Sequence, residues 1–152
     1  MEENYDHIRG EDTQKDKYLI FSIGEGDYGL PIRYVIEIIN ILEITKVPEQ
    51  PDHVKGLINL RGKILPVMDV RLRFKKPERE YDDRTCIVVI DVDGTSCGLI
   101  VDNVREVASI DEANISGTPP MGDEEASGFI EGVGKMGNEI WLLVDCKKLM
   151  SE

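Results

Sequence analysis

Apolar and polar residues alternate from residue 17 to residue 23, which places Leu19, Phe21 and Ile23 on one face of an extended chain. A period of two is the spacing of side chains on a half-buried β-strand. A glycine- and acid-rich tetrapeptide, residues 24–27, follows this strand, and a second apolar segment begins at Tyr28. The order predicts that a β-hairpin opens the fold.

The next apolar segment, residues 35–47, is dense in isoleucine and valine, which suit a pleated surface better than a helix. We predict one strand here, ended by Pro48 and Pro51. Its apolar residues occupy both faces, so burial of one face cannot hide them all. These residues are Ile36, Ile38, Ile39, Ile41, Leu42 and Ile44. Either the strand is covered on both sides, or part of it forms an interface with another molecule.

Turn signals divide the rest of the chain into further short strands. Apolar residues 54–60 and 64–70 flank the segment Arg61, Gly62 and Lys63, which predicts a second hairpin. The basic and polar residues 71–84 are expected to form a surface connection. Later strands are predicted at residues 85–92, 96–101 with a continuation to 110, 129–133 and 139–144, and a short helix at 145–150. About nine or ten short strands predict an all-β architecture, either a barrel or a sandwich.

Acidic residues outnumber basic residues, 30 against 18, and give a formal charge of −12. This charge repels phosphate backbones and anionic lipid, so nucleic-acid binding starts at a disadvantage. Residues 1–16 are acidic and poor in apolar side chains, and we expect them to form a disordered tail. No apolar run approaches the length of about 18 residues that a membrane span requires. The pattern predicts a cytoplasmic protein without direct membrane insertion.

The candidate chemical motifs are weak. Residues 24–29 and 132–137 both match G-x-G-x-x-G, but each precedes a strand-like segment and not the helix that a dinucleotide site requires. Residues 91–102 imitate a calcium loop without its final glutamate. Cys86, Cys97 and Cys146 lack C-x-x-C spacing, which favours buried reduced thiols over a metal site or disulfides. Nothing in the sequence argues positively for catalysis, a metal or a cofactor.

Glu37 and Arg61 each interrupt apolar surroundings. They are either two separate surface charges or a partly buried ion pair that fixes the geometry of neighbouring strands. A buried pair contributes little net stability, but removing one partner is costly.

Residues 54–71 read V-K-G-L-I-N-L-R-G-K-I-L-P-V-M-D-V-R and closely resemble the signature of the CheW-like family. Residues 28–38, residues 97–104 and the ending at residues 130–145 also resemble segments of this family. The resemblance covers about residues 16–150 without large gaps. The G-x-x-N-L-R-G block makes it highly specific.

The resemblance implies an all-β fold of two small five-stranded SH3- or OB-like barrels, which share strands around a hydrophobic seam and end in a short C-terminal helix. We expect residues 17–150 to form this domain. The first barrel would span roughly residues 32–82, and the second roughly residues 84–146 together with the hairpin at 17–31.

The resemblance also implies a non-catalytic adaptor without a cofactor. Such an adaptor couples methyl-accepting chemoreceptors to the CheA histidine kinase in bacterial chemotaxis. Its partners would be the regulatory domain of the kinase and the cytoplasmic tip of the receptors, at membrane-associated receptor arrays.

Matching positions imply two sets of site residues. Receptor coupling is expected at Val35, Glu37, Gly56, Asn59, Arg61, Gly62 and Ile87. Kinase binding is expected at Ile39, Asn40, Ile41 and Ile44. Among the first set, the glycines would permit tight backbone geometry, Val35 and Ile87 would offer apolar groove surface, and Arg61 would orient the motif.

Two other classes of function are weighed against this scaffold. Small β-barrels often bind single-stranded nucleic acid through basic grooves and stacked aromatic rings. An aromatic content of 6% and the charge of −12 count against that function. An enzyme would need an acid, base or nucleophile with a shifted pKa in a pocket. The sequence nominates no such residue.

Overall fold

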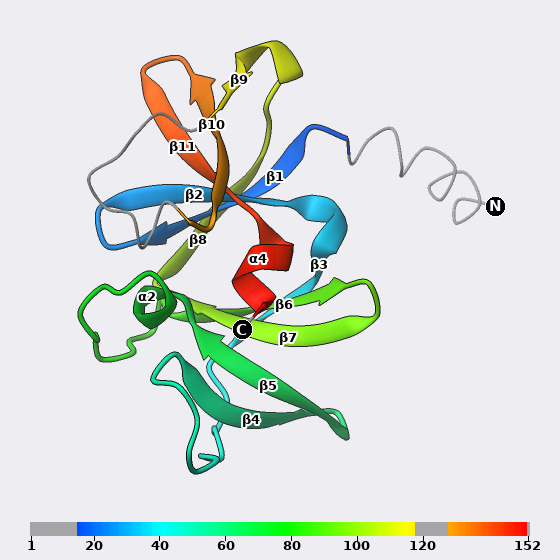
Figure 1. Ribbon diagram of the computed structural model, residues 1–152, viewed down its shortest axis with the longest axis vertical. Helices are drawn as coiled ribbons and strands as arrows, with labels where there is room; N and C mark the ends of the chain where they lie inside the picture. Colours follow the sequence, from blue (N-terminus) through cyan, green and yellow to red (C-terminus); the bar gives the residue numbers. More distant parts are fainter. Residues whose placement is uncertain (1–14, 118–127, 152) are drawn as a thin grey trace, which may run out of the picture.

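Two β-sheets lie one above the other, with the C-terminal helix between them (Figure 1). The computed structural model describes residues 15–117 and 128–151. The predicted acidic tail lies almost entirely outside the described residues. The predicted all-β class is confirmed, because strands form most of the regular structure and the helices are short.

The six-stranded sheet contains the opening hairpin and most of the C-terminal strands. Its order is β8 (Asn103–Ser109), β1 (Lys17–Ile23), β2 (Gly26–Pro31), β11 (Glu139–Val144), β10 (Ile130–Met136) and β9 (Ile115–Ser116). The pairing of β2 with β11 is parallel and joins the first part of the chain to the last. The opening hairpin is therefore an interior element of this sheet.

The five-stranded sheet contains the middle of the chain. Its order is β3 (Val35–Asn40), β6 (Cys86–Val92), β7 (Thr95–Val101), β5 (Lys63–Asp69) and β4 (Val54–Leu60). Three short helices lie between strands, namely η1 (Ile32–Tyr34), α2 (Val70–Arg73) and η2 (Glu112–Asn114), and α4 (Cys146–Met150) follows the last strand. The strands β3 and β4 occupy the two edges of this sheet.

The sheets differ from the expected pair of closed barrels. Within the described part of the chain, the edge strands β3 and β4 do not pair along their length. A single bridge between Thr45 and Leu57 spans the opening. The expected boundary near residue 83 does not separate the sheets, because β6 and β7 pair with β3 and β5. One sheet also has six strands where five were expected.

Three predicted elements have different bounds in the structure. The strand predicted at residues 35–47 ends at Asn40. Its continuation crosses the open side of the sheet, where Thr45 meets Leu57. The start of the predicted surface connection is the helix α2, which Asp69 caps through its side chain. The segment predicted as one continuous strand to residue 110 divides at Asp102 into β7 and β8, which belong to different sheets.

Three clusters of buried apolar side chains hold the described elements together. One cluster fills the seam between the sheets and includes Phe21, Phe74 and Leu99. Ile58 and Ile100 belong to a second cluster, which lies on the five-stranded sheet, and a third cluster lies on the six-stranded sheet. Alternate residues of β6 belong to the first two clusters. Because both faces of β6 are buried, its sequence is a continuous apolar run.

Candidate functional site

The turn between β4 and β5 has a backbone geometry that its sequence explains. Arg61 and Gly62 have φ values of 52° and 90°, and Leu60 pairs with Lys63 on either side of them. Two central residues with positive φ are typical of the type I′ turn, which joins strands with the natural twist. The side chain of Asn59 accepts a hydrogen bond from the Gly62 backbone N–H at 2.8 Å. The predicted hairpin is thus confirmed.

Arg61 and Glu37 form an ion pair across the open side of the five-stranded sheet. Glu37 lies on the edge strand β3, and Arg61 lies in the turn that begins at the other edge strand, β4. The Arg61 side chain is 68% exposed and that of Glu37 is 29% exposed. Of the two alternatives that the sequence left open, the structure shows the ion pair, in which only the carboxylate is shielded from solvent. A pair this exposed contributes little stability and serves mainly to orient the turn relative to β3.

Gly56 allows the chain after β3 to approach β4. A Cβ atom at this position would lie 2.0 Å from the carbonyl oxygen of Thr45, and the φ angle of 144° is one that side chains rarely adopt. Thr45 and Leu57 exchange two backbone hydrogen bonds of 2.8 Å at this point. The predicted role of Gly56 in tight backbone geometry therefore agrees with the contacts around it.

The outer face of β3 is an exposed apolar surface. Ile36 and Ile38 are 54% and 42% exposed, and Asn40 on the same face is also exposed. We call these three residues the β3 surface. Val35 and Ile39, on the other face of β3, are half-buried and pack against the core clusters. The apolar residues on both faces of the predicted strand are thus not all covered, and Ile36 and Ile38 are exposed to solvent.

The residues predicted to bind the kinase differ in accessibility. Asn40 is exposed, whereas Ile39, Ile41 and Ile44 are half-buried and pack against the cluster on the five-stranded sheet. Ile36 and Ile38 were not predicted from the sequence as kinase contacts. Their segment nevertheless has more apolar residues than burial of one strand face can cover.

Ile87 does not lie on the surface. Its side chain is 0% exposed and belongs to the cluster on the five-stranded sheet, where it contacts the position of Gly98. The expectation that Ile87 offers apolar groove surface is therefore wrong. The sequence could not show this, because β6 is apolar on both faces. Any influence of Ile87 on binding must act through the position of β6, which pairs with β3 in the same sheet.

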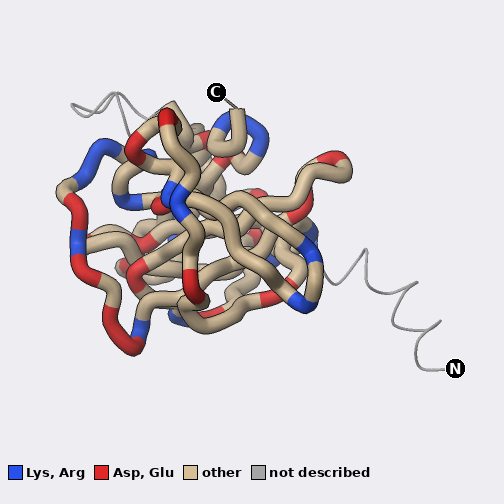
Figure 2. The backbone as a smooth tube through the Cα atoms, turned by 90° about the horizontal axis from the view of Figure 1, so that it is seen from below, with Lys and Arg blue, Asp and Glu red and all other residues tan. Residues whose placement is uncertain are grey.

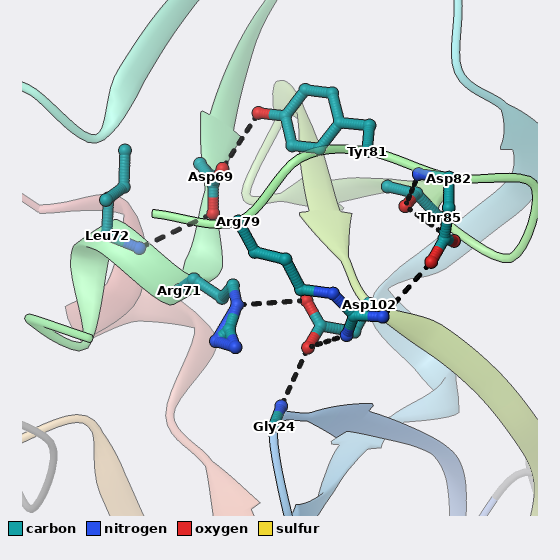
Figure 3. A network of polar contacts seen from close by, with 9 residues as sticks. All are labelled: Gly24, Asp69, Arg71, Leu72, Arg79, Tyr81, Asp82, Thr85 and Asp102. Carbon is teal, nitrogen blue, oxygen red and sulfur yellow. Dashed lines mark hydrogen bonds and ion pairs between the residues drawn. The ribbon is translucent and has the colours of Figure 1, made fainter. Parts of the chain in front are cut away.

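A polar network fastens the connections between the sheets (Figure 3). Asp102, between β7 and β8, accepts a hydrogen bond from the Gly24 backbone N–H at 2.7 Å. It also forms ion pairs with Arg71 and Arg79 at 3.3 and 3.1 Å. One carboxylate thus ties the opening hairpin to α2 and to the segment that follows it. This network was not predictable from the sequence, because its members are far apart along the chain.

A second carboxylate in Figure 3 stabilises the same region. Asp69 is 1% exposed, caps α2 and accepts a hydrogen bond from the Tyr81 hydroxyl at 2.8 Å. Burial, and then this hydrogen bond to a carboxylate, raise the pKa of Tyr81. The arrangement holds the residue 77–84 connection on the sheet and offers no free acid or base.

The described residues provide little basis for metal or thiol chemistry. No group of three or more His, Cys, Asp or Glu side chains in this part of the chain is placed to hold a metal ion. All three cysteines are free thiols, and burial raises the pKa of Cys97 to about 11 and that of Cys146 to about 12. Within residues 15–117 and 128–151, no helix is long and apolar enough to cross a bilayer.

Comparisons with known proteins agree with this geometry. Residues 17–152 match the profile of a family described as the CheW-like domain. The chemotaxis protein CheW of Klebsiella aerogenes is 34% identical over 140 residues, which cover 92% of this chain and 84% of that protein. The chemotaxis protein CheW of Bacillus subtilis is 28% identical, over 90% of this chain and 88% of its own length.

A solved structure shares the fold. The crystal structure of the scaffolding protein TtCheW from Thermoanaerobacter tengcongensis superposes with a TM-score of 0.80 and 38% identity, covering 86% of this chain and 88% of that chain. The profile match includes both sheets and every residue of the Glu37–Arg61 site. The chain therefore belongs to the CheW-like family, as a scaffold protein of chemotaxis signalling.

Proposed function

We propose that this chain couples the cytoplasmic tips of methyl-accepting chemoreceptors to the regulatory domain of the CheA histidine kinase. Members of its family are non-catalytic scaffolds, so the function consists of holding partners in a fixed relation. The observation that carries the proposal is the exposed apolar strand edge beside an oriented ion pair. Neither feature is needed to complete the described cores.

The β3 surface is proposed as the kinase contact. Ile36 and Ile38 offer apolar area at the edge of a sheet, and an edge strand can pair with a strand of a related domain. Asn40 continues this face. Ile41 and Ile44 fix the segment after β3, because they pack against the cluster on the five-stranded sheet. The binding of a second small β-domain would cover apolar area that is otherwise in water.

The Glu37–Arg61 pair and the turn around it are proposed as part of the receptor contact. The receptor tip is helical, and an amphipathic helix can place its apolar side against Val35 while its polar side meets the exposed guanidinium of Arg61. Asn59 and Gly62 fix the backbone that presents Arg61. Many modest contacts of this kind gain strength in an array, where neighbouring sites raise the effective concentration. In the cell, this activity places the chain in the cytoplasm at receptor arrays.

A titration by heteronuclear NMR tests both contacts. The labelled chain would be titrated with the regulatory domain of CheA and, separately, with a receptor-tip fragment from the same organism. We expect saturable shifts at the β3 surface with the kinase domain, and at Val35, Glu37 and Arg61 with the receptor fragment. A folded spectrum that responds to neither partner would overturn the proposal.

A further inference from the structure

Two neighbouring cavities open beside the segment that leads into β4. Their volumes are about 460 and about 530 Å³. Pro51, His53 and Arg73 line both, so the cavities share a wall. The residues of the β3 surface and the Glu37–Arg61 pair line neither of them. The cavities are therefore separate from the contacts proposed for receptor and kinase.

The smaller cavity concentrates positive charge on an acidic protein. Arg73, Lys75 and Lys76 line it together with His53, and the only carboxylate among its lining residues is that of Asp52. The ion pairs found among the described residues include none of these three cations. Figure 2 shows basic segments on several sides of the backbone, and some of them lie near the C-terminal end. Uncompensated cations in a concave site attract anions, because the surrounding protein focuses their field.

Arg73 is fixed in the wall between the cavities. Its Nε donates to the backbone carbonyl of Leu149 at 3.1 Å, and its Nη2 donates to the carbonyl oxygens of Lys148 and Ser151. The guanidinium also lies 4.7 Å from the centre of the Phe129 ring. Neutral carbonyl groups do not cancel its charge. Arg73 thus fastens the end of α4 and still contributes a cation to the site.

His53 contacts this cation. Its Nε2 lies 3.3 Å from Nη1 of Arg73 and must accept the hydrogen bond, because a guanidinium can only donate. This contact favours the neutral form of the ring. Burial, and then the charges of Arg73 and Lys75, lower the pKa of His53, against the smaller opposing effect of Asp52. A bound anion would reverse this balance.

The larger cavity provides an apolar wall. Val54, Val67, Met68, Cys97 and Met150 line it, beside polar groups that include Ser96. Methionine side chains are flexible and adapt to differently shaped apolar groups. An inorganic anion would occupy only the basic cavity. The combination fits a ligand that carries both carboxylates and an apolar side chain.

We propose that the joined cavities bind an acidic segment of a partner protein. Its carboxylates lie against Lys75, Lys76 and His53, and an apolar side chain of the same segment enters the cavity lined by Met68 and Met150. Carboxylates beside His53 favour its protonated form, so binding takes up a proton. The affinity therefore rises as the pH falls toward the lowered pKa of His53 in the free protein.

Fluorescence anisotropy with a labelled peptide tests the proposal. The probe is the acidic peptide acetyl-Glu-Asp-Leu-Glu-Asp-Leu-Glu-amide, and its reference is the same peptide with Gln and Asn in place of Glu and Asp. We expect saturable binding of the acidic peptide alone. The double substitution Lys75→Gln with Lys76→Gln should weaken binding about tenfold, since two charge contacts are removed. His53→Gln should remove the increase in affinity at low pH.

A matched control removes two lysines that line neither cavity. Lys15 and Lys135 belong to the other end of the molecule, beside β1 and in β10. The double substitution Lys15→Gln with Lys135→Gln lowers the charge equally and should leave peptide binding unchanged. Equal losses in both double variants would show a nonspecific charge effect and would overturn the proposal. Binding to phosphatidylglycerol vesicles without binding to the peptide would assign the cavities to a membrane surface instead.

Discussion

Replacing Gly56 with alanine tests how the open side of the five-stranded sheet is held. The new Cβ atom would lie 2.0 Å from the carbonyl oxygen of Thr45 and 2.7 Å from its carbonyl carbon. Both atoms belong to the backbone, so the segment at Thr45 must move away by more than 1 Å or so before ordinary contact distances return. Such a movement breaks the two hydrogen bonds that Thr45 exchanges with Leu57.

The expected loss of stability follows from two effects. Each of the two hydrogen bonds contributes about 1 kcal/mol to the folded state. Holding the backbone of a residue with a side chain at a φ angle of 144° costs about 1 to 3 kcal/mol more. We therefore expect Gly56→Ala to lower the free energy of unfolding by about 4 kcal/mol, which is a large part of the stability of a domain of this size.

Two other glycines separate the steric effect from the conformational one. Gly62 has a φ angle of 90° but no heavy atom within 4 Å of a new Cβ, so Gly62→Ala should cost only about 1 to 2 kcal/mol. Gly117 has neither constraint, and Gly117→Ala should change stability by less than about 0.5 kcal/mol. Urea unfolding followed by the fluorescence of Trp141, which is 3% exposed, measures all three variants. A Gly56→Ala variant as stable as Gly62→Ala would refute the close approach of Thr45.

Three further predictions concern the site and the core. Glu37→Arg or Arg61→Glu should change the unfolding free energy by less than about 1 kcal/mol but weaken receptor-tip binding. The double exchange should recover part of the lost binding, and no recovery in calorimetric titrations would argue against direct pairing. Ile38→Lys should weaken kinase-domain binding about tenfold, whereas Ile140→Lys, at an even more exposed position on β11, should not; equal losses would mean that the β3 surface has no special role. Burial raises the pKa of Cys97 to about 11, so the native state keeps a proton that the unfolded state releases near pH 8.5. The free energy of unfolding should therefore fall as the pH rises above about 8.5. Iodoacetamide at pH 8 should label Cys97 only on unfolding, and fast labelling of Cys97 in the folded chain would contradict the burial of this side chain.

Local features of the chain were predictable from the sequence. The β4–β5 turn follows from Arg61 and Gly62, because positive φ angles at two adjacent positions are a local requirement. The short C-terminal helix follows in the same way from Asp145, which accepts hydrogen bonds from the first backbone N–H groups of α4. The Glu37–Arg61 pairing was identified as one of two alternatives, since both charges stand in apolar surroundings.

Features that depend on distant segments were not predictable. The division into two sheets depends on the parallel pairs β2–β11 and β5–β7, which no local pattern specifies. β3 ends at Asn40 although isoleucines continue in the sequence after it. The segment after β3 crosses the sheet at Thr45, and this close approach requires the glycine at position 56. Ile87 was misplaced for a related reason, because an apolar strand with both faces covered does not reveal which side chains reach the surface.

The most direct test of the coupling function is a reconstitution of receptor-controlled kinase activity. Receptor-containing membranes, CheA and ATP would be combined with and without this chain, and phosphorylation of CheA would be measured. We expect kinase activity to respond to receptor ligand only when the chain is present, and Ile38→Lys and the single charge exchanges at Glu37 and Arg61 to reduce this response. A kinase that responds to receptor ligand equally well without the chain, or a folded chain that leaves CheA uncoupled, would contradict it.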